Sequence, residues 1–409
     1  MTQSVDLLLR NPSEYPRAGL VVRQWKPVAK ALGVRGARSA TVARLLDPTN
    51  PKGATVDLAA QVDRLVPHDR SHDQLVFKLD SPIPGGDEHY RAVSGKVRVT
   101  AAQSNAQPYG ATVQRYPTGV KLINQHLEVW LNTSATKYAH QPQDQFYGGA
   151  VTSVILQKAS FPPFTDRLEC VDAIESRAGF WPHPEARAMQ IDRIHLVRPP
   201  WDERRSVDFF PFREPWTLVS DSTGPVRAVA TIMSAPFELR CKEAGGKSDH
   251  VFECNVYRTL SLYDDVDWIG DEIWVNARDI DTGKTQRLWF TARFFMMVQF
   301  TQDPELFKYP DHPGWFSLTP PDKPSSDPRL GYAFATDAQS GAIWSPPLDY
   351  HDEMTKPRAF SWELGTSRTV HCVHKFRCMT NALEMGHEAG WLWYDLVFKR
   401  IRGTLAGEK

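Results

Sequence analysis

Apolar and polar side chains alternate most clearly in the middle of the chain, between Ser222 and Val275. A side-chain period of two is typical of a β-strand with one face on a core and one face open. Arg258 interrupts the apolar positions, so its guanidinium needs a partner or an edge of the sheet. The apolar positions of the run 251–263 are Phe252, Cys254, Val256, Leu260 and Leu262, and the alternate ones are Glu253, Asn255, Tyr257, Thr259, Ser261 and Tyr263.

Short runs rich in β-branched and aromatic residues predict strands along most of the chain. A short helix is predicted from Pro27 to Leu32, ended by Gly33. Residues 159–215 and 304–328 lack this pattern and predict long loops, and no fixed-period repeat indicates a propeller or solenoid. The predicted strands lie at 20–25, 59–63, 75–79, 96–100, 120–131, 147–156, 226–231, 251–263, 266–275, 286–300, 370–376 and 391–398, with a hairpin at 331–337 and 341–344.

These elements predict an all-β protein. A chain of 409 residues exceeds one ordinary hydrophobic core, so we expect two domains. Residues 1–105 are predicted to form a small N-terminal β-sandwich domain. Residues 106–119, rich in Gln, Pro and Gly, predict a linker, and residues 120–409 predict the larger domain.

Net charge and cysteine usage limit the partners and the location. The 48 basic and 48 acidic residues balance, which argues against nucleic acid or a membrane surface as a partner. The N-terminus has no basic and apolar leader pattern, and no apolar run approaches the roughly 20 residues that span a bilayer. The five cysteines are odd in number and scattered, as free thiols of a reducing cytoplasm are. We therefore expect a cytoplasmic protein and leave a homo-oligomer open.

Several motifs resemble the galactose-mutarotase-like supersandwich, preceded by a β-sandwich module of carbohydrate-active proteins. The resemblance implies a large antiparallel sandwich with a concave sugar-binding face. Aldose mutarotases, several polysaccharide lyases and parts of some glycoside hydrolases share that fold, so it implies several chemistries. The motifs are Asn11-Pro12, Tyr15-Pro16-Arg17, Val21-Val22 and Trp25 near the start, then Gln61-Val62, Leu75-Val76-Phe77, Pro84-Gly85 with Tyr90, Asn124 with Leu127-Glu128-Val129, Gly148 to Val154, Gly224 to Ala228, and Tyr257 to Tyr263.

Two groups of residues have the types that acid–base catalysis uses. The stretch from Trp344 to Asp352 places Asp349 and Tyr350 next to a histidine on a proline-stiffened loop, and the alternative is a rigid surface loop. The second group lies between His371 and Tyr394. His371 and His374 differ by an odd number, so a regular strand points them to opposite sides, His374 toward the core and His371 toward the open side.

A third group combines aromatic and basic residues in the predicted loops. Aromatic faces can stack on sugar C–H groups, and arginine can pair with a carboxylate through two bonds. This combination suits an acidic sugar, although each residue can equally pack its loop onto the sheet. The group is Tyr147, Arg177, Trp181, His183, Arg193, His195, Trp201 and Arg204.

The preferred hypothesis is a lyase that acts on oligosaccharides or glycosides, with no cofactor and with a divalent cation such as calcium left open. The alternatives are a glycoside hydrolase using Glu253, Asp337, Asp349 or Glu384, a non-catalytic sugar-binding protein, and an epimerase or mutarotase. The predicted catalytic residues are His183, Tyr350, His371, His387, Asp349 and Glu384. The predicted substrate-binding residues are Tyr147, Arg177, Trp181, Arg193, Trp201, Arg258, Trp344 and Trp391.

Overall fold

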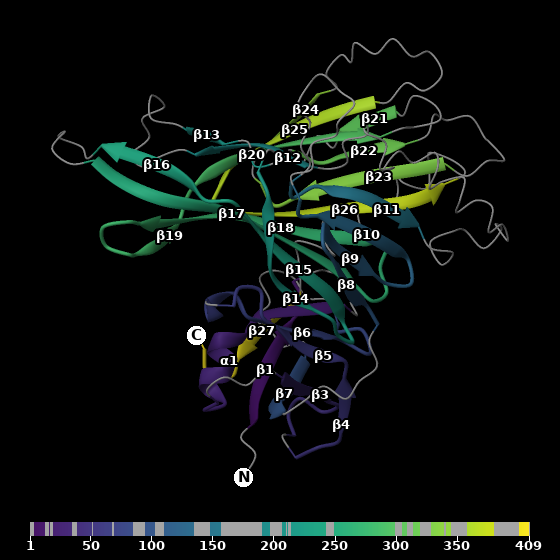
Figure 1. Ribbon diagram of the computed structural model, residues 1–409. Coiled ribbons are helices and arrows are strands. Elements are labelled where there is room, and N and C mark those ends of the chain that lie inside the picture. The colour runs from purple at the N-terminus through teal and green to yellow at the C-terminus, as the bar shows by residue number, and fades with distance from the viewer. Residues whose placement is uncertain are drawn as a thin grey trace. The chain divides into compact units, whose positions relative to one another are not determined.

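The prediction of an all-β protein is confirmed in the computed structural model (Figure 1), where antiparallel strands make up nearly all of the described elements. The α-helix among them, α1, has seven residues. No described helix is long and apolar enough to cross a membrane. The structure describes residues 4–12, 16, 19–34, 39–50, 52–67, 69–84, 95–102, 110–134, 148–156, 190–196, 207–209, 211, 214–242, 249–298, 305–308, 314–319, 329–338, 341–344, 358–379 and 401–408.

The chain divides into two compact units. The first contains Met1–Thr112, Ser220–Val229 and Gly390–Lys409, and the second contains Val113–Val219 and Ala230–Ala389. The first unit therefore combines the beginning of the chain with a middle segment and the end. The predicted linker, 106–119, overlaps strand β8 (Thr112–Tyr116), so this part of it is a paired strand. The predicted domain boundaries themselves stay a prediction.

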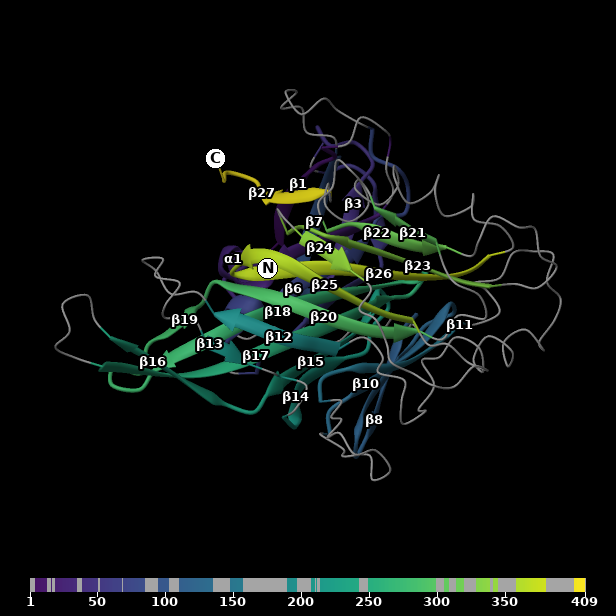
Figure 2. The ribbon, with the colours of Figure 1, turned by 90° about the horizontal axis from the view of Figure 1, so that it is seen from above.

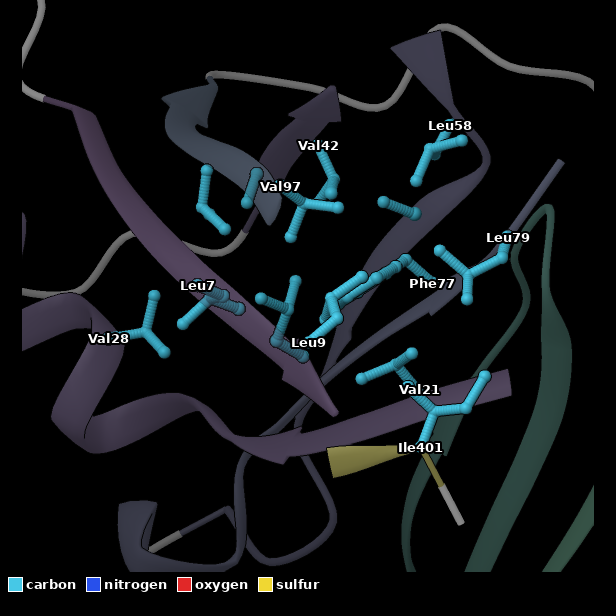
Figure 3. Packing of buried hydrophobic residues seen from close by; sticks show 14 of the residues in the cluster. Leu7, Leu9, Val21, Val28, Val42, Leu58, Phe77, Leu79, Val97 and Ile401 are labelled. Atoms are coloured by element: carbon cyan, nitrogen blue, oxygen red, sulfur yellow. The ribbon is translucent and has the colours of Figure 1, made fainter. Parts of the chain in front are cut away.

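Two antiparallel sheets build the first unit. Their strand orders are β27-β1-β7-β3-β4 and β2-β6-β5. Apolar side chains from both sheets share one core, in which Leu7, Val21 and Phe77 have no exposed surface (Figure 3). The bounds are β1 Ser4–Arg10, β2 Leu20–Gln24, β3 Ser39–Leu45, β4 Thr55–Leu58, β5 Ala60–Asp63, β6 Gln74–Lys78, β7 Gly95–Ala102, β27 Arg402–Leu405 and a 3-10 turn at Arg70–His72.

The helix α1 (Trp25–Ala31) lies close to the predicted range 27–32. Trp25 and Val28 point into the core of the first unit. The chain leaves the helix through Gly33, whose φ of 66° is a left-handed conformation that glycine adopts without steric cost. The predicted helix and its predicted stop are both confirmed.

The Gln61 side chain joins residues 220–229 to the first unit. Its carbonyl oxygen accepts hydrogen bonds from the backbone N–H groups of Val226 and Arg227 at 2.9 and 3.0 Å. Its amide nitrogen donates to the Arg227 carbonyl at 3.0 Å, and the buried Arg227 guanidinium pairs with Asp63 at 2.7 Å. A Cβ atom on Gly224 would lie only 2.3 Å from the Gln61 Oε1, so this close approach requires glycine.

Three sheets carry the second unit, and the boundary between the units falls within β14 and β15. The four-stranded sheet contains β11-β10-β9-β8, with β9 Gly119–Ile123, β10 Leu127–Asn132 and β11 Val151–Leu156. The five-stranded sheet contains β13-β12-β20-β25-β24, with β12 Gln190–Leu196, β13 Val207–Phe209, β20 Phe290–Val298, β24 Gly341–Trp344 and β25 Arg358–Ser367.

The ten-stranded sheet is the largest in the described part of the chain. The five-stranded sheet lies over its strands β17, β18 and β26, as Figures 1 and 2 show from two directions. Phe294 of β20 lies 6.2 Å from the Phe334 ring of β23, which joins the two sheets through an apolar core. The ten strands are β14 Trp216–Ser222, β15 Arg227–Ser234, β16 Phe237–Lys242, β17 Asp249–Tyr263, β18 Trp268–Asp279, β19 Thr285–Arg287, β21 Glu305–Lys308, β22 Phe316–Thr319, β23 Arg329–Thr336 and β26 Thr369–Met379.

Three predicted connections are wrong. The predicted loop at 159–215 contains β12 and β13, and the predicted loop at 304–328 contains β21 and β22. The predicted hairpin of 331–337 and 341–344 is not formed, because β23 pairs with β26 and β22 while β24 pairs with β25 in another sheet. Short strands among prolines carry little periodicity, and pairing partners are not encoded locally. The predicted strand at 391–398 lies outside the described residues.

Gly149 to alanine should destabilise the protein more than Gly283 to alanine. Both glycines have positive φ, 70° and 67°, so each substitution carries backbone strain. Only at Gly149 would the new Cβ clash, 2.4 Å from the Trp216 ring, while Gly283 has open space. We expect Gly149→Ala to cost about 1–3 kcal/mol more than Gly283→Ala in urea denaturation. Equal losses would contradict the packing seen at Gly149.

Candidate functional site

Strands β17, β18 and β26 present two different faces, as the alternation of side chains predicts. The face toward the five-stranded sheet is apolar except for one buried polar group of residues. The opposite face, called the polar face below, carries aromatic, hydroxyl, amide and charged residues. The apolar face holds Cys254, Val256, Leu260, Ile269, Ile273, Val275, Val370 and Cys372, and the polar face holds Tyr257, Thr259, Glu272, Trp274, Asn276, Thr369 and His371.

Arg258 and Asp271 form an ion pair inside the apolar face. Both side chains are fully buried, and Arg258 Nη2 lies 2.6 Å from Asp271 Oδ2. Arg258 Nη1 donates a further bond of 2.6 Å to the Gly149 carbonyl. Burial by itself raises the pKa of Asp271, but the charge of Arg258 and the hydrogen bond from His374 outweigh it and hold the pKa below its usual value. The carboxylate is therefore ionised and matched by the guanidinium.

His374 and Tyr332 extend this buried group across two more strands. His374 Nε2 lies 3.2 Å from Asp271 Oδ2, and Tyr332 Oη lies 2.8 Å from His374 Nδ1. Burial lowers the pKa of His374 although the Asp271 carboxylate acts in the opposite direction. A neutral imidazole fits both contacts when Nε2–H donates to Asp271 and Nδ1 accepts from the Tyr332 hydroxyl. The sequence prediction of a core histidine at 374 is confirmed.

These pKa shifts make the protein less stable in acid. The folded state holds His374 at a lowered pKa, so the unfolded chain takes up its proton first as the pH falls below about 6.5. The lowered pKa of Asp271 adds a further loss below about pH 4. We expect His374→Gln to show a smaller drop in unfolding free energy between pH 8 and pH 5 than the wild type. Parallel urea-denaturation curves for the two proteins over this pH range would contradict the assignment.

His371 lies on the polar face between two carboxylates. Asp337, just after β23, accepts the His371 backbone N–H at 2.9 Å and lies 2.6 Å from its ring Nδ1. The other ring nitrogen, Nε2, is 3.7 Å from Glu272 Oε1 on β18. The side chains of His371, Asp337 and Glu272 are 40%, 36% and 20% exposed. We call these three residues the histidine site.

Aromatic and cationic residues adjoin the histidine site on the polar face. Tyr257 and Trp274 are direct cross-strand neighbours, and their rings stack at 5.2 Å with an interplanar angle of 4°. The Arg287 guanidinium lies 5.3 Å from the Trp274 ring centroid and donates to Thr369 Oγ1 at 2.5 Å. Thr369 is two positions before His371 and so shares its face. Trp274 is buried beneath these groups, whereas Arg287, Thr369 and His371 are partly exposed, so a guanidinium and an imidazole reach the surface near each other.

Most predicted site residues lie outside the described residues, so their roles stay predictions. Arg193 lies in β12 and Trp344 in β24, and the structure describes the strands but not these side chains. His371 is accessible, as its predicted role requires. The residues outside the described part are Tyr147, Arg177, Trp181, His183, Trp201, Asp349, Tyr350, Glu384, His387 and Trp391.

Two predictions for described residues need correction. Arg258 has no exposed surface and its guanidinium is bonded to Asp271 and Gly149, so we assign it to the core rather than to substrate binding. Glu253 on β17 is exposed to solvent and lies opposite Arg278 of β18. It lies six positions from Thr259, the residue opposite Glu272, which corresponds to about 20 Å along the strand. Glu253 is thus too far from the histidine site to pair with Asp337.

Glu272 and Arg287 are site residues that the sequence did not single out. Glu272 alternates with Trp274 on β18, and the alternation places both on the face opposite Ile273. That alternation could have marked Glu272 as accessible, but its position opposite His371 comes from the pairing of β18 with β26. No group of three or more His, Cys, Asp or Glu side chains among the described residues is arranged to hold a metal ion. Binding of a divalent cation by other parts of the chain therefore stays a prediction.

Comparison with known proteins finds distant structural likenesses. No family model matches the chain, and no curated protein sequence matches it. An α-mannosidase from Enterococcus faecalis V583 is similar over 100% of this chain and 46% of its own, with 8% identity and a TM-score of 0.41. A protein in the glycosyl hydrolase family 38 from Enterococcus faecalis is similar over 100% of this chain and 48% of its own, with 7% identity and a TM-score of 0.42.

A galactose mutarotase-like protein from Clostridium acetobutylicum is also similar. The similarity covers 66% of this chain and 98% of that protein, with 10% identity and a TM-score of 0.34. The present chain spans about half the length of the two Enterococcus faecalis proteins. The fold rests on the strand pairing described above, and the function has to be inferred from the side chains.

Proposed function

We propose that this chain is a carbohydrate-active enzyme that binds a sugar on the polar face and transfers protons through His371. The observation that carries the proposal is the histidine site, in which each imidazole nitrogen has a carboxylate nearby on an accessible sheet surface. The resemblance of the sequence to mutarotase-like proteins supports a sugar as the substrate. Tyr257 and the hydroxyl of Thr369 supply ring and hydrogen-bonding surface for it.

The geometry gives each member of the histidine site a role. Asp337 holds the imidazole by two contacts, at the backbone N–H and at Nδ1, so the ring orientation is fixed. The Nε2 atom then faces the side of Glu272 and can accept or deliver a proton at a bound hydroxyl. Glu272 is beyond hydrogen-bonding distance of Nε2 and is placed to take a proton from a second hydroxyl of the same sugar.

A neutral sugar fits this surface better than an acidic one at His371 itself. Two carboxylates flank the imidazole and repel a further carboxylate at that position. Hydrolysis by these two acids is disfavoured, because a glycosidase needs an open gap between its carboxylates and here the imidazole fills it. Proton transfer at the anomeric centre, as in the interconversion of sugar anomers, is the reaction that we infer.

Elimination from an acidic sugar is the second candidate, and Arg287 favours it. Its guanidinium lies on the polar face, at Thr369, two positions from His371. A sugar carboxylate paired with Arg287 would place the adjacent carbon near the imidazole, and removal of that proton begins a lyase reaction. This is the reaction that the sequence favours, with Arg287 in place of the buried Arg258.

One panel of assays tests the two reactions and the alternatives. The full chain is incubated with neutral aldoses, with uronate oligosaccharides and with neutral oligosaccharides. Accelerated anomer exchange, followed by NMR, supports the first reaction, and new ultraviolet absorbance from a C=C bond supports elimination. Release of reducing ends without that absorbance would indicate hydrolysis and contradict both. Sugar binding without any turnover would contradict the proposal of an enzyme.

A further inference from the structure

The four-stranded sheet of β8 to β11 has a second surface with unusual side chains. Its inward residues are apolar and buried, while alternate positions point to solvent. Tyr116 is 42% exposed, more than any other aromatic side chain in the described part of the chain. The outward group, called the aromatic platform below, consists of Gln114, Tyr116, Lys121, Glu128 and Trp130.

Contacts across three strands hold the aromatic platform together. The Tyr116 and Trp130 rings lie 4.7 Å apart, inclined at 44°. Lys121 Nζ is 5.8 Å from both ring centroids and 2.5 Å from Glu128 Oε1. The Tyr116 hydroxyl donates to Gln114 Oε1 at 2.9 Å. The two rings are thus fixed relative to each other, and their orientation does not have to be selected when a ligand binds.

The charge of the aromatic platform indicates the class of its ligand. Lys121 and Glu128 form an ion pair without net charge, so the pair does not favour an anion over a cation. It still presents ammonium, carboxylate, amide and phenol groups, which together can both donate to and accept from hydroxyl groups. A ligand with one apolar face, many hydroxyls and no charge meets these conditions, and a pyranose ring has all three properties.

We propose that the aromatic platform is a carbohydrate-binding site for neutral sugar residues, separate from the histidine site. The exposed ring of Tyr116 stacks on the C–H face of the sugar, and Trp130 supports it from the neighbouring strand. Gln114, Lys121 and Glu128 bond the hydroxyls at the rim. The site contains no catalytic residue and holds a polysaccharide on the protein. It does not depend on the reaction assigned to His371.

Affinity gel electrophoresis with the full chain tests this site. The probes are galactomannan, mixed-linkage β-glucan, xylan and polygalacturonate, each cast into a native gel. We expect retardation by at least one neutral polysaccharide. Tyr116→Ala should weaken it by roughly tenfold or more, whereas Tyr116→Phe, which keeps the ring, should retain most of it. Thermal melting of the two variants confirms that both are folded, which is expected because Tyr116 is largely exposed.

The outcomes separate this site from the histidine site and from a purely structural cluster. His371→Gln should bind polysaccharide as the wild type does, whatever its activity. Retardation by no probe, or by polygalacturonate alone, would overturn the proposal of a neutral-sugar site. Retardation that is unchanged in Tyr116→Ala would also overturn it, since the sugar would then bind elsewhere. A fall in melting temperature without any sugar binding would assign the cluster to sheet stability through its ring and ammonium contacts.

Discussion

Asp271→Ala is expected to lower the free energy of unfolding by about 3–5 kcal/mol, because it leaves a buried guanidinium without its counter-ion. Arg258 has no exposed surface, and the Gly149 carbonyl, which it also contacts, is neutral and does not replace the carboxylate charge. The neutral His374 would lose its acceptor as well. Urea denaturation followed by tryptophan fluorescence measures the loss.

A double variant serves as the matched control for this prediction. Arg258→Met combined with Asp271→Leu removes both charges, so much of the loss should be recovered. Glu238→Ala breaks an exposed ion pair with Arg240 and should leave stability unchanged within error. If Asp271→Ala were as stable as Glu238→Ala, the buried ion pair would not be present in solution.

His371→Gln is expected to reduce kcat/KM by about 10²- to 10⁴-fold in whichever sugar assay shows turnover, the usual contribution of a general acid or base. Its melting temperature should stay close to that of the wild type, because the side chain is 40% exposed. Activity is measured on purified full-length protein next to a melting curve.

The neighbours of His371 supply the controls. Lys375 lies four positions further along β26 on the same face, at 3.6 Å from Asp267, and Lys375→Gln should leave activity unchanged. Asp337→Ala should lower kcat more than it changes KM. The substitution lets the imidazole ring of His371 rotate but removes no contact with the substrate. Full activity of His371→Gln would remove the histidine site as the catalytic centre.

The faces of β17 could be predicted from sequence because a period of two is a local property. Cys254, Val256 and Leu260 are buried as their spacing indicates. The same spacing showed that Arg258 needed a partner and that His371 and His374 point apart. The sequence analysis did not name Asp271, although Asp271 interrupts the apolar set of Ile269 and Ile273 in the way that Arg258 interrupts its own.

The composition of the histidine site could not be predicted, because it comes from strand pairing. Glu272 is opposite His371 through the register of β18 and β26, and Asp337 reaches the ring from the end of β23. These strands are separated by roughly 30 to 100 residues of sequence, and nothing local to His371 specifies which strand becomes its neighbour. Arg258 was assigned to substrate binding because its charge suggested contact with a sugar carboxylate. Its burial became visible only in the folded sheet.

The pairing of β1 with β27, Leu7 opposite Leu405, has a consequence for biosynthesis. β1 and β27 are far apart in the sequence, so the ribosome makes β1 long before the strand with which it pairs. Closing so long a loop carries an entropic cost and slows the final step of folding. Until then this edge of β1 is open to strands of other nascent chains, so we expect chaperones to protect the sheet that contains β1 during translation.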